Sequence, residues 1–306
     1  MSINSCLAYD EECKYVLCDK KFLSYLLKLC VKEYENLPLA QIEQYIEVEN
    51  NKVGRILPRG NEIITVMKEK IVLDVLFTSK YPGSERNIDT FINLEAQNEY
   101  HPKSKNHKSY PLIKRSIYYV GSLLHIQKGP VFENDNYQDL KKVNSLWINT
   151  DPPENVKNTI QRYELREKNE LKKTYGEKKE NYDLINIVML NLGEEEDGVL
   201  GPLNELFVKD NTAEEKYRNL KEKYGIEVSE ETRGGIQTMC NLGEGILRKG
   251  INQGISQGIR KGIDTRTIEF ITRIMQSKNF DYAQAARYLE LTEEEQIDYQ
   301  MYFMKQ

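Results

Sequence analysis

Two apolar runs that each carry one carboxylate decide the fold of this chain. The first is Ile71-Val72-Leu73-Asp74-Val75-Leu76-Phe77, and the second, FINLEAQ at residues 91–97, contains Glu95. Continuous β-branched and aliphatic runs of this length are typical of strands that are buried on both faces. A carboxylate on such a strand is costly to remove from water unless it is paired, protonated or bound to a cation. The sequence therefore predicts two buried strands, each with a carboxylate that needs a partner.

The short segment between the two runs indicates that the strands are neighbours. It contains the polar turn Lys80-Tyr81-Pro82-Gly83-Ser84, so the strands can form a hairpin that sets Asp74 beside Glu95. Side chains alternate along a strand, which places Gln97 on the same face as Glu95. Paired carboxylates are oxygen ligands of the hardness that Mg²⁺ prefers. This pattern predicts a divalent-metal site that contains Asp74 and Glu95.

Length and composition allow one sizeable α/β core with an appended domain. The chain has 306 residues, of which 30% are charged and 39% hydrophobic, and its net charge is −5. This acidic total argues against wholesale coating of nucleic acid but allows a local basic cleft. No stretch approaches the roughly 20 apolar residues of a membrane span, and no secretory signal is visible, so we expect a cytoplasmic protein without a membrane partner. The five cysteines form no C-x-x-C pair, which favours plain thiols over zinc ligands or disulfides.

The order of the predicted elements indicates a mixed sheet. Amphipathic spacing predicts a helix over residues 20–35, a short one near residues 42–46 and another over residues 112–124. Besides the two acidic strands, residues 143–149 and 182–190 are predicted to be strands that end at turn residues. Helix, strand, strand, helix, strand, strand is typical of a compact α/β core with helices against a mixed sheet.

The C-terminal part of the chain is predicted to be helical. Residues 196–244 are highly charged, residues 245–263 contain a four-residue Gly-Ile repeat, and residues 264–306 form a small helical piece in which Thr292 and Glu295 fit a capping box. Two accounts of the repeat stay open. It is either a flexible, low-complexity linker, or a helix whose glycines, each costing up to about 1 kcal/mol relative to alanine, admit a close partner helix and make the chain a homo-oligomer.

A polar, basic segment follows the second acidic strand. It includes Lys103, Lys105 and Lys108, and the helix predicted after it opens with Lys114 and Arg115. Such residues pair with the backbone phosphates of nucleic acid, although an ordinary solvated loop has a similar composition. Because Lys114 and Arg115 begin a helix, we expect at least one of them to face the active edge of the sheet, and Arg115 is our choice.

The arrangement of Asp74, Glu95 and Gln97 resembles the PD-(D/E)XK nuclease motif, in which an aspartate and a D/E-x-K tripeptide lie on adjacent strands. The chain departs from that motif because Gln97 stands in place of lysine and Leu73, not proline, precedes Asp74. With this departure, the chain resembles the Rpn branch of the superfamily, the recombination-promoting nucleases also described as PD-(D/E)XK nuclease family transposases. The stretches that carry this resemblance are INLEAQN at 92–98, PLIKRSIYY at 111–119, SLWI at 145–148, YDLIN at 182–186 and MCNL at 239–242, together with the Gly-Ile tail.

This resemblance spans roughly residues 20 to 300 and implies both a fold and an activity. The fold is a restriction-endonuclease-like mixed sheet flanked by helices, formed by residues 1–195, with a helical C-terminal region. The activity is that of a Mg²⁺-dependent DNA endonuclease, which hydrolyses phosphodiester bonds, promotes recombination and is linked to mobile elements. Divalent cations other than Mg²⁺ stay open as its cofactor. The rival class is a catalytically inactive DNA-binding or assembly protein that retains the fold.

The resemblance also assigns roles to individual residues. Asp74 and Glu95 bind the metal, Gln97 positions water or phosphate without bringing a positive charge, and Arg115 steadies the phosphate. Members of the superfamily often add a carboxylate from the first core helix. For that position three residues stay open: Glu33, Glu43 and Glu47.

Overall fold

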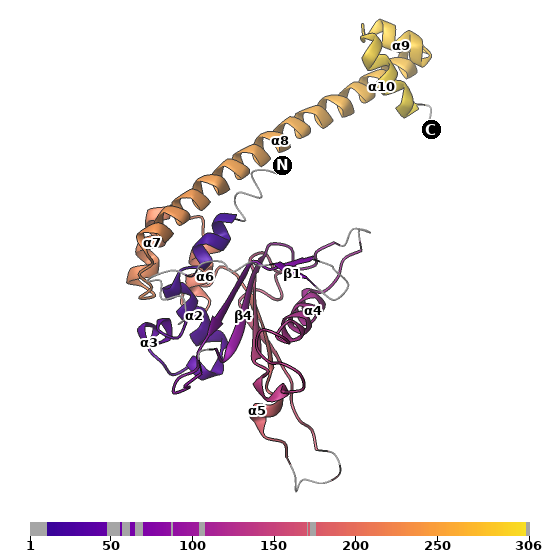
Figure 1. Cartoon of the computed structure of the whole chain (residues 1–306). Coiled ribbons are helices and arrows are strands. Elements are labelled where there is room, and N and C mark those ends of the chain that lie inside the picture. Colours follow the sequence, from indigo (N-terminus) through magenta and orange to yellow (C-terminus); the bar gives the residue numbers. More distant parts are fainter. Residues whose placement is uncertain are drawn as a thin grey trace. The chain divides into compact units, whose positions relative to one another are not determined.

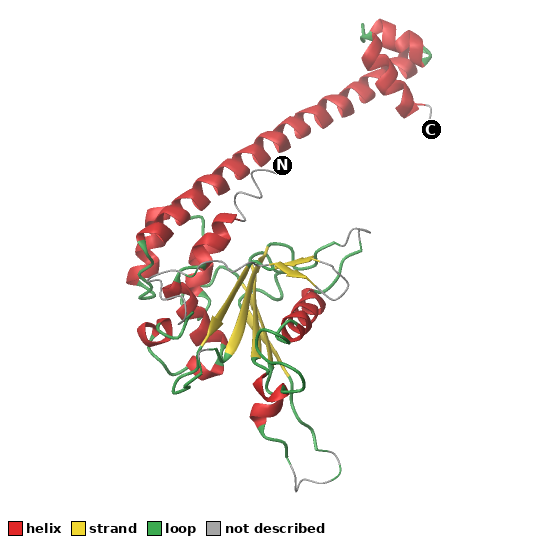
Figure 2. Cartoon of the chain, in the orientation of Figure 1, coloured by secondary structure: helices red, strands yellow, loops and turns green. Residues whose placement is uncertain are grey.

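The chain forms two compact units that divide after Leu242 (Figures 1 and 2). The computed structural model describes residues 11–47, 56, 62–64, 70–86, 88–103, 108–169, 171 and 176–303. Strands and helices alternate in the first unit, whereas the described part of the second unit is helical.

A five-stranded mixed sheet forms the centre of the first unit, with the strand order β3-β4-β5-β7-β6. The three inner strands, β4 (Thr90–Gln97), β5 (Lys142–Asn149) and β7 (Ile185–Asn191), are parallel. The two edge strands, β3 (Val75–Ser79) and β6 (Thr159–Glu164), are antiparallel to their neighbours. The carboxyl ends of the parallel strands therefore meet at one edge, and the predicted mixed sheet is confirmed.

Helices cover both faces of this sheet (Figure 1). On one face, α4 (Leu112–His125) buries Tyr119 and Leu123 against Trp147 of β5. On the other face, α2 (Lys20–Cys30), η1 (Lys32–Tyr34) and α3 (Leu39–Glu43) share a larger apolar cluster with the sheet. Residues alternate along β4, so Leu94 belongs to the α2 side and Glu95 to the α4 side.

The apolar run at residues 71–77 is not a single strand, and this part of the prediction is wrong. It divides into β2 (Lys70–Val72) and β3, with Leu73 and Asp74 between them. β2 pairs with β1 (Glu62–Ile64) in a separate two-stranded sheet, whereas β3 pairs with β4. The chain changes sheets at Asp74, and the N–H of Asp74 donates to the side chain of Glu95 in β4.

Other elements differ from the prediction at their ends. The helix expected over residues 20–35 ends at Cys30, because Val31 is extended (φ −120°, ψ 116°), and η1 follows. The strand expected from residue 182 begins at Ile185, after the short helix α5 (Lys179–Tyr182). The sequence also gave no signal for β6, whose last four residues are exposed on this edge strand and lack an apolar alternation.

Residues 196–242 belong to the first unit, although their composition sets them apart. α6 (Gly201–Phe207) and α7 (Ala213–Glu222) bury Leu203 and Leu220 in the same apolar cluster as α2. Buried Asp19 ties this region to the sheet domain. Its Oδ1 accepts from the first turn of α2, and its Oδ2 accepts from the Ser229 N–H at 3.0 Å and the Thr232 hydroxyl at 2.8 Å.

The long helix α8 (Glu230–Lys278) contains the Gly-Ile repeat, so the repeat is helical rather than a coil linker. Ile251 and Ile255, which lie one helical turn apart, are 52% and 55% exposed. Two short helices follow, α9 (Tyr282–Tyr288) and α10 (Glu293–Phe303). The capping box predicted at Thr292 and Glu295 is confirmed, because each side chain accepts a hydrogen bond from the other residue's N–H.

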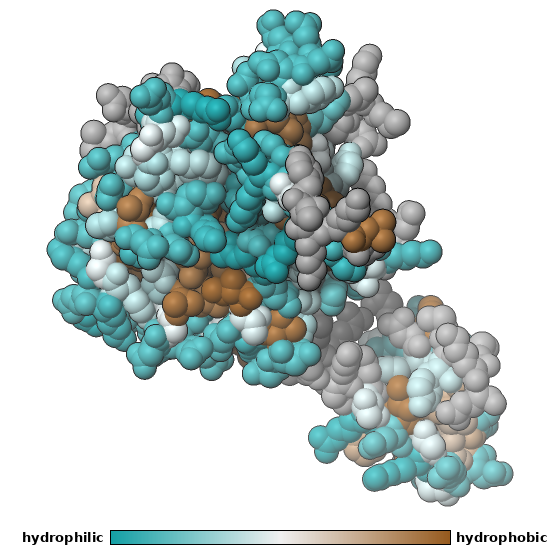
Figure 3. All heavy atoms as spheres, turned by 90° about the horizontal axis from the view of Figure 1, so that it is seen from below, coloured by the Kyte–Doolittle hydropathy of each residue, from teal (hydrophilic) through white to brown (hydrophobic). Residues whose placement is uncertain are grey.

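The face of the molecule seen in Figure 3 is largely hydrophilic, with apolar residues gathered in small patches. Within the described part of the chain, no helix combines the length and the apolar character that a bilayer span needs.

Candidate active site

Asp74 and Glu95 lie side by side, as the sequence predicts. The register pairs Val75 with Leu94, so the next position sets Asp74 opposite Glu95. The Asp74 N–H donates to Glu95 Oε1 at 3.2 Å, and the Ala96 N–H donates to Asp74 Oδ2 at 3.0 Å. Each carboxylate is thus held by the backbone of the other strand segment, which fixes the two groups in one geometry.

Burial perturbs Glu95 strongly. Its side chain is fully buried, and Oε2 has no hydrogen-bond partner among the described residues. Loss of hydration, and after it the negative charge of Asp74, raise the pKa of Glu95 to about 8, while the positive charge of Arg115 opposes the shift. A buried carboxylate with an unpartnered oxygen and a raised pKa is typical of a functional site.

Arg115 is the cation on the Glu95 side of the site. It projects from the first turns of α4, and its Nη2 lies 3.8 Å from Glu95 Oε2. Its Nη1 donates to Gln97 Oε1 at 3.3 Å, and its Nε donates to the Tyr119 hydroxyl at 2.9 Å. The guanidinium also lies 5.0 Å from the ring centroid of Tyr119 and 5.4 Å from that of Trp147. Of the two basic residues that open α4, Arg115 is thus the one that faces Glu95 and Gln97, as expected.

Lys14 is the cation on the Asp74 side, and no pattern in the sequence predicts it. It belongs to a helical segment at residues 11–17, and its Nζ lies 3.0 Å from Asp74 Oδ1. Nothing in the spacing of the first helical residues pairs Lys14 with a strand far along the chain. Only the packing of that segment against the sheet domain brings the two side chains together.

The other basic residues predicted to bind substrate belong to the segment after β4 and to the start of α4. Lys103, Lys108 and Lys114 are exposed, and Lys105 lies outside the described residues. Exposed lysines near the carboxyl end of β4 are free to follow a flexible strand of nucleic acid. Their role stays a prediction, since the structure assigns them no contact with Asp74 or Glu95 among the described residues.

None of the three helix-borne carboxylates considered from the sequence joins the described site. Glu33 pairs with Lys142 at 3.4 Å, at the amino end of β5 and thus the end of the sheet opposite Gln97. The N–H of Glu47 donates to Thr78, which pairs with the beginning of β4. Glu43 ends α3, and its charge acts with that of Glu47 on Lys20.

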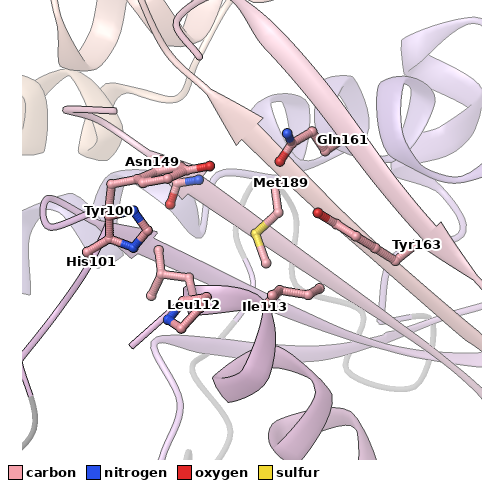
Figure 4. Close-up of a pocket in the computed structure, with 9 residues that line it drawn as sticks. Tyr100, His101, Leu112, Ile113, Asn149, Gln161, Tyr163 and Met189 are labelled. Carbon is pink, nitrogen blue, oxygen red and sulfur yellow. The ribbon is translucent and has the colours of Figure 1, made fainter. Parts of the chain in front are cut away.

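A small cavity of about 60 Å³ opens one strand away from Gln97 (Figure 4). The register places Asn149 beside Gln97, and Asn149 lines the cavity with Met189 at its centre. His101 lies on one side, and Gln161 and Tyr163 of β6 lie on the other. The Asn149 amide donates to Asn191 Oδ1 at 2.7 Å, which locks this side chain at the carboxyl edge of the sheet.

The donor set of Asp74 and Glu95 fits a hard divalent cation. Both are oxygen ligands, and Oε2 of Glu95, which has no hydrogen-bond partner among the described residues, is a buried atom that a cation would satisfy. Within the described residues, no group of three or more His, Cys, Asp or Glu side chains forms a metal cage. Two carboxylates are nevertheless enough for Mg²⁺, because this ion retains several waters and is often bound through only one or two carboxylates.

Comparison with known proteins adds no assignment to this geometry. No family model, no curated protein and no solved structure matches the chain.

Proposed function

We propose that the protein is a Mg²⁺-dependent DNA endonuclease on a restriction-endonuclease-like core, acting in the cytoplasm to promote recombination linked to mobile elements. The observation that carries this proposal is the pairing of Asp74 with buried Glu95 at the carboxyl end of a mixed sheet. Two adjacent carboxylates flanked by two cations suit the hydrolysis of a phosphodiester, whose transition state gathers negative charge. The choice of DNA and the link to recombination rest on the family resemblance.

Asp74 and Glu95 would hold the divalent cation. When bound, such a cation supplies Lewis-acid polarisation of the phosphate and an acidified water. The residues of the chain then position the substrate. Arg115, oriented by the Tyr119 hydroxyl, directs its guanidinium toward the same region as Gln97 and donates to a phosphate oxygen. Gln97 accepts from Arg115 and keeps its amide N–H groups for a water or a phosphate oxygen.

Burial of Glu95 also shapes the site. Because Glu95 is fully buried, bulk water is kept away from its carboxylate, and charge–charge interactions there are stronger than at the surface. Because its pKa is raised, Glu95 must lose its proton before it can bind a cation. Binding of a cation is therefore coupled to release of a proton from this residue.

The test is cleavage of supercoiled plasmid by the purified full chain with Mg²⁺. The isosteric Asp74→Asn variant should abolish cleavage, whereas the matched control Asp135→Asn, at an exposed position, should leave it unchanged. Cleavage by the Asp74→Asn protein at the rate of the wild type would indicate a contaminating nuclease and would contradict the assignment of Asp74.

The rival is a DNA-binding or assembly protein that has lost catalysis. The observation in its favour is that Lys14 and Arg115 already face the two carboxylates, as in a purely structural ion-pair cluster. Wild-type protein that shifts DNA in a gel with Ca²⁺ but never cleaves with Mg²⁺ or Mn²⁺ would support this rival over the nuclease.

A further inference from the structure

Lys14 lies where a cation bound to Asp74 would lie. Its Nζ is 3.0 Å from Oδ1, while Oδ2 accepts the Ala96 N–H at 3.0 Å. Both oxygens of Asp74 are thus engaged, so a divalent cation gains one of them only when a contact gives way. The Ala96 N–H is fixed in β4, whereas a lysine ammonium ends a flexible four-carbon stem. Lys14 is therefore the contact that yields.

The segment that carries Lys14 is firmly anchored. Its neighbours Cys13, Val16 and Leu17 are buried in the main apolar cluster. Gly235 of α8 packs so closely on this segment that a Cβ there would lie 2.9 Å from a ring carbon of Tyr15. The Lys14 side chain, 28% exposed, thus reaches Asp74 from a fixed base. The contact is part of the built site and not a chance pairing of mobile surface charges.

The two cations of the site differ in how they are held. Arg115 contacts Tyr119, Gln97 and Glu95 through separate nitrogens, so its guanidinium keeps its place if one contact is lost. Lys14 presents a single compact ammonium. A divalent cation held by Asp74 and Glu95 would repel that ammonium at short range, and rotation of the lysine stem would move it away from Oδ1.

We propose that Lys14 holds the cation position at Asp74 in the metal-free protein, leaves Oδ1 when a divalent cation binds, and then contacts the scissile phosphate. It would thereby supply the positive charge that Gln97 does not bring. This inference rests on the proposed nuclease function for its last step, while the competition at Asp74 stands on geometry alone.

The experiment compares the full-length wild type with Lys14→Met, Lys14→Arg and a control, Lys21→Met, which removes an exposed lysine from α2. Mn²⁺ binding is measured by isothermal titration calorimetry. Cleavage of supercoiled plasmid is measured at saturating Mn²⁺. Lys14→Met should bind Mn²⁺ about tenfold more tightly, because the competing charge is gone, and should cleave about 100-fold more slowly. Lys14→Arg should keep most of the competition, and Lys21→Met should match the wild type.

Each outcome decides a separate question. Equal Mn²⁺ affinity for the wild type and Lys14→Met overturns the competition, and unchanged cleavage overturns the phosphate contact. If Lys14→Met binds Mn²⁺ more tightly than the wild type but the wild type never cleaves plasmid, the competition at Asp74 is supported and the nuclease function is contradicted. If only Lys14→Met binds Mn²⁺, the competition is supported in its strongest form. If neither protein binds, both this inference and the metal site are wrong.

Discussion

The main-chain N–H of Asp74 donates to Oε1 of Glu95 across the point where the chain leaves one sheet and enters another. This hydrogen bond joins the two carboxylate residues directly, while Oε2 of Glu95 is buried without a hydrogen-bond partner among the described residues and lies 3.8 Å from Arg115 Nη2. The site is therefore organised before any ligand is present. The protonation of Glu95, the contacts of Arg115 and the cavity beside Asn149 can each be tested separately.

Glu95 should make the metal-free protein less stable as pH rises. Its pKa is about 8 in the folded chain and 4.5 when unperturbed, so between these values the folded state binds more protons than the unfolded state. Under that condition the free energy of unfolding falls with rising pH. Asp74, Lys14, Arg115 and Tyr119 surround the group, and their net effect is contained in the raised pKa.

Urea denaturation at about pH 5.5 and about pH 8 measures this effect. Glu95→Gln should remove a large part of the pH dependence, because the amide mimics the protonated carboxyl without titrating. The exposed control Glu133→Gln should retain the dependence of the wild type. A Glu95→Gln protein that loses as much stability as the wild type over this range would contradict the prediction.

Arg115 should matter far more to cleavage than its neighbour Lys114. Arg115→Met removes three contacts within the site, and we expect cleavage to fall about 100-fold, the usual cost of losing one donor to developing charge. Arg115→Lys should recover only part of the rate, since lysine lacks the planar fork. Lys114→Met, at an exposed position on the same helix turn, serves as the control. Similar losses for both positions would mean that general basic charge, rather than Arg115 itself, binds the phosphate.

Tyr163 should contribute to binding of the DNA strand beside the cleavage site. It lines the cavity next to Asn149 and is 41% exposed, so its ring is available to a base. Because stacking of one base on an aromatic ring contributes about 1–3 kcal/mol, Tyr163→Ala should weaken binding of single-stranded DNA by about tenfold. Fluorescence anisotropy in Ca²⁺ measures the affinity. Tyr137→Ala, which removes a 61% exposed tyrosine before the amino end of β5, should have little effect, and equal losses would argue against this cavity.

The Gly-Ile repeat should mediate self-association. Ile251 and Ile255 are half-exposed on one face of α8, a position that favours burial against a second helix. The double substitution Ile251→Glu and Ile255→Glu, like deletion of residues 245–263, should lower the mass measured by light scattering. Asn252→Glu adds a charge at an exposed position between them and should not. An unchanged mass for the double variant would show that this stripe does not bind another copy.

The sequence by itself determined the mixed α/β sheet and the pair of carboxylates. The short apolar runs at β5 and β7, bounded by turn residues, favour buried strands, and the short turn after β3 makes β3 a neighbour of β4. The pairing of Asp74 with Glu95 followed from this local connection. The position of Arg115 followed in part from the helix that begins shortly after β4, because the helix of such a crossover packs back onto the sheet, here against β5 and β7.

Only the tertiary structure decided the features that depend on contacts between distant segments. Lys14 reaches Asp74 because buried Cys13, Val16 and Leu17 dock its helical segment on the core, and no local pattern encodes that docking. The break at Leu73 arises because β2 and β3 belong to different sheets, although their residues form one continuous apolar run. Periodicity reports which residues are buried, but it does not report what they are buried against. The carboxylates could therefore be predicted from the chain, whereas the cation beside Asp74 could not.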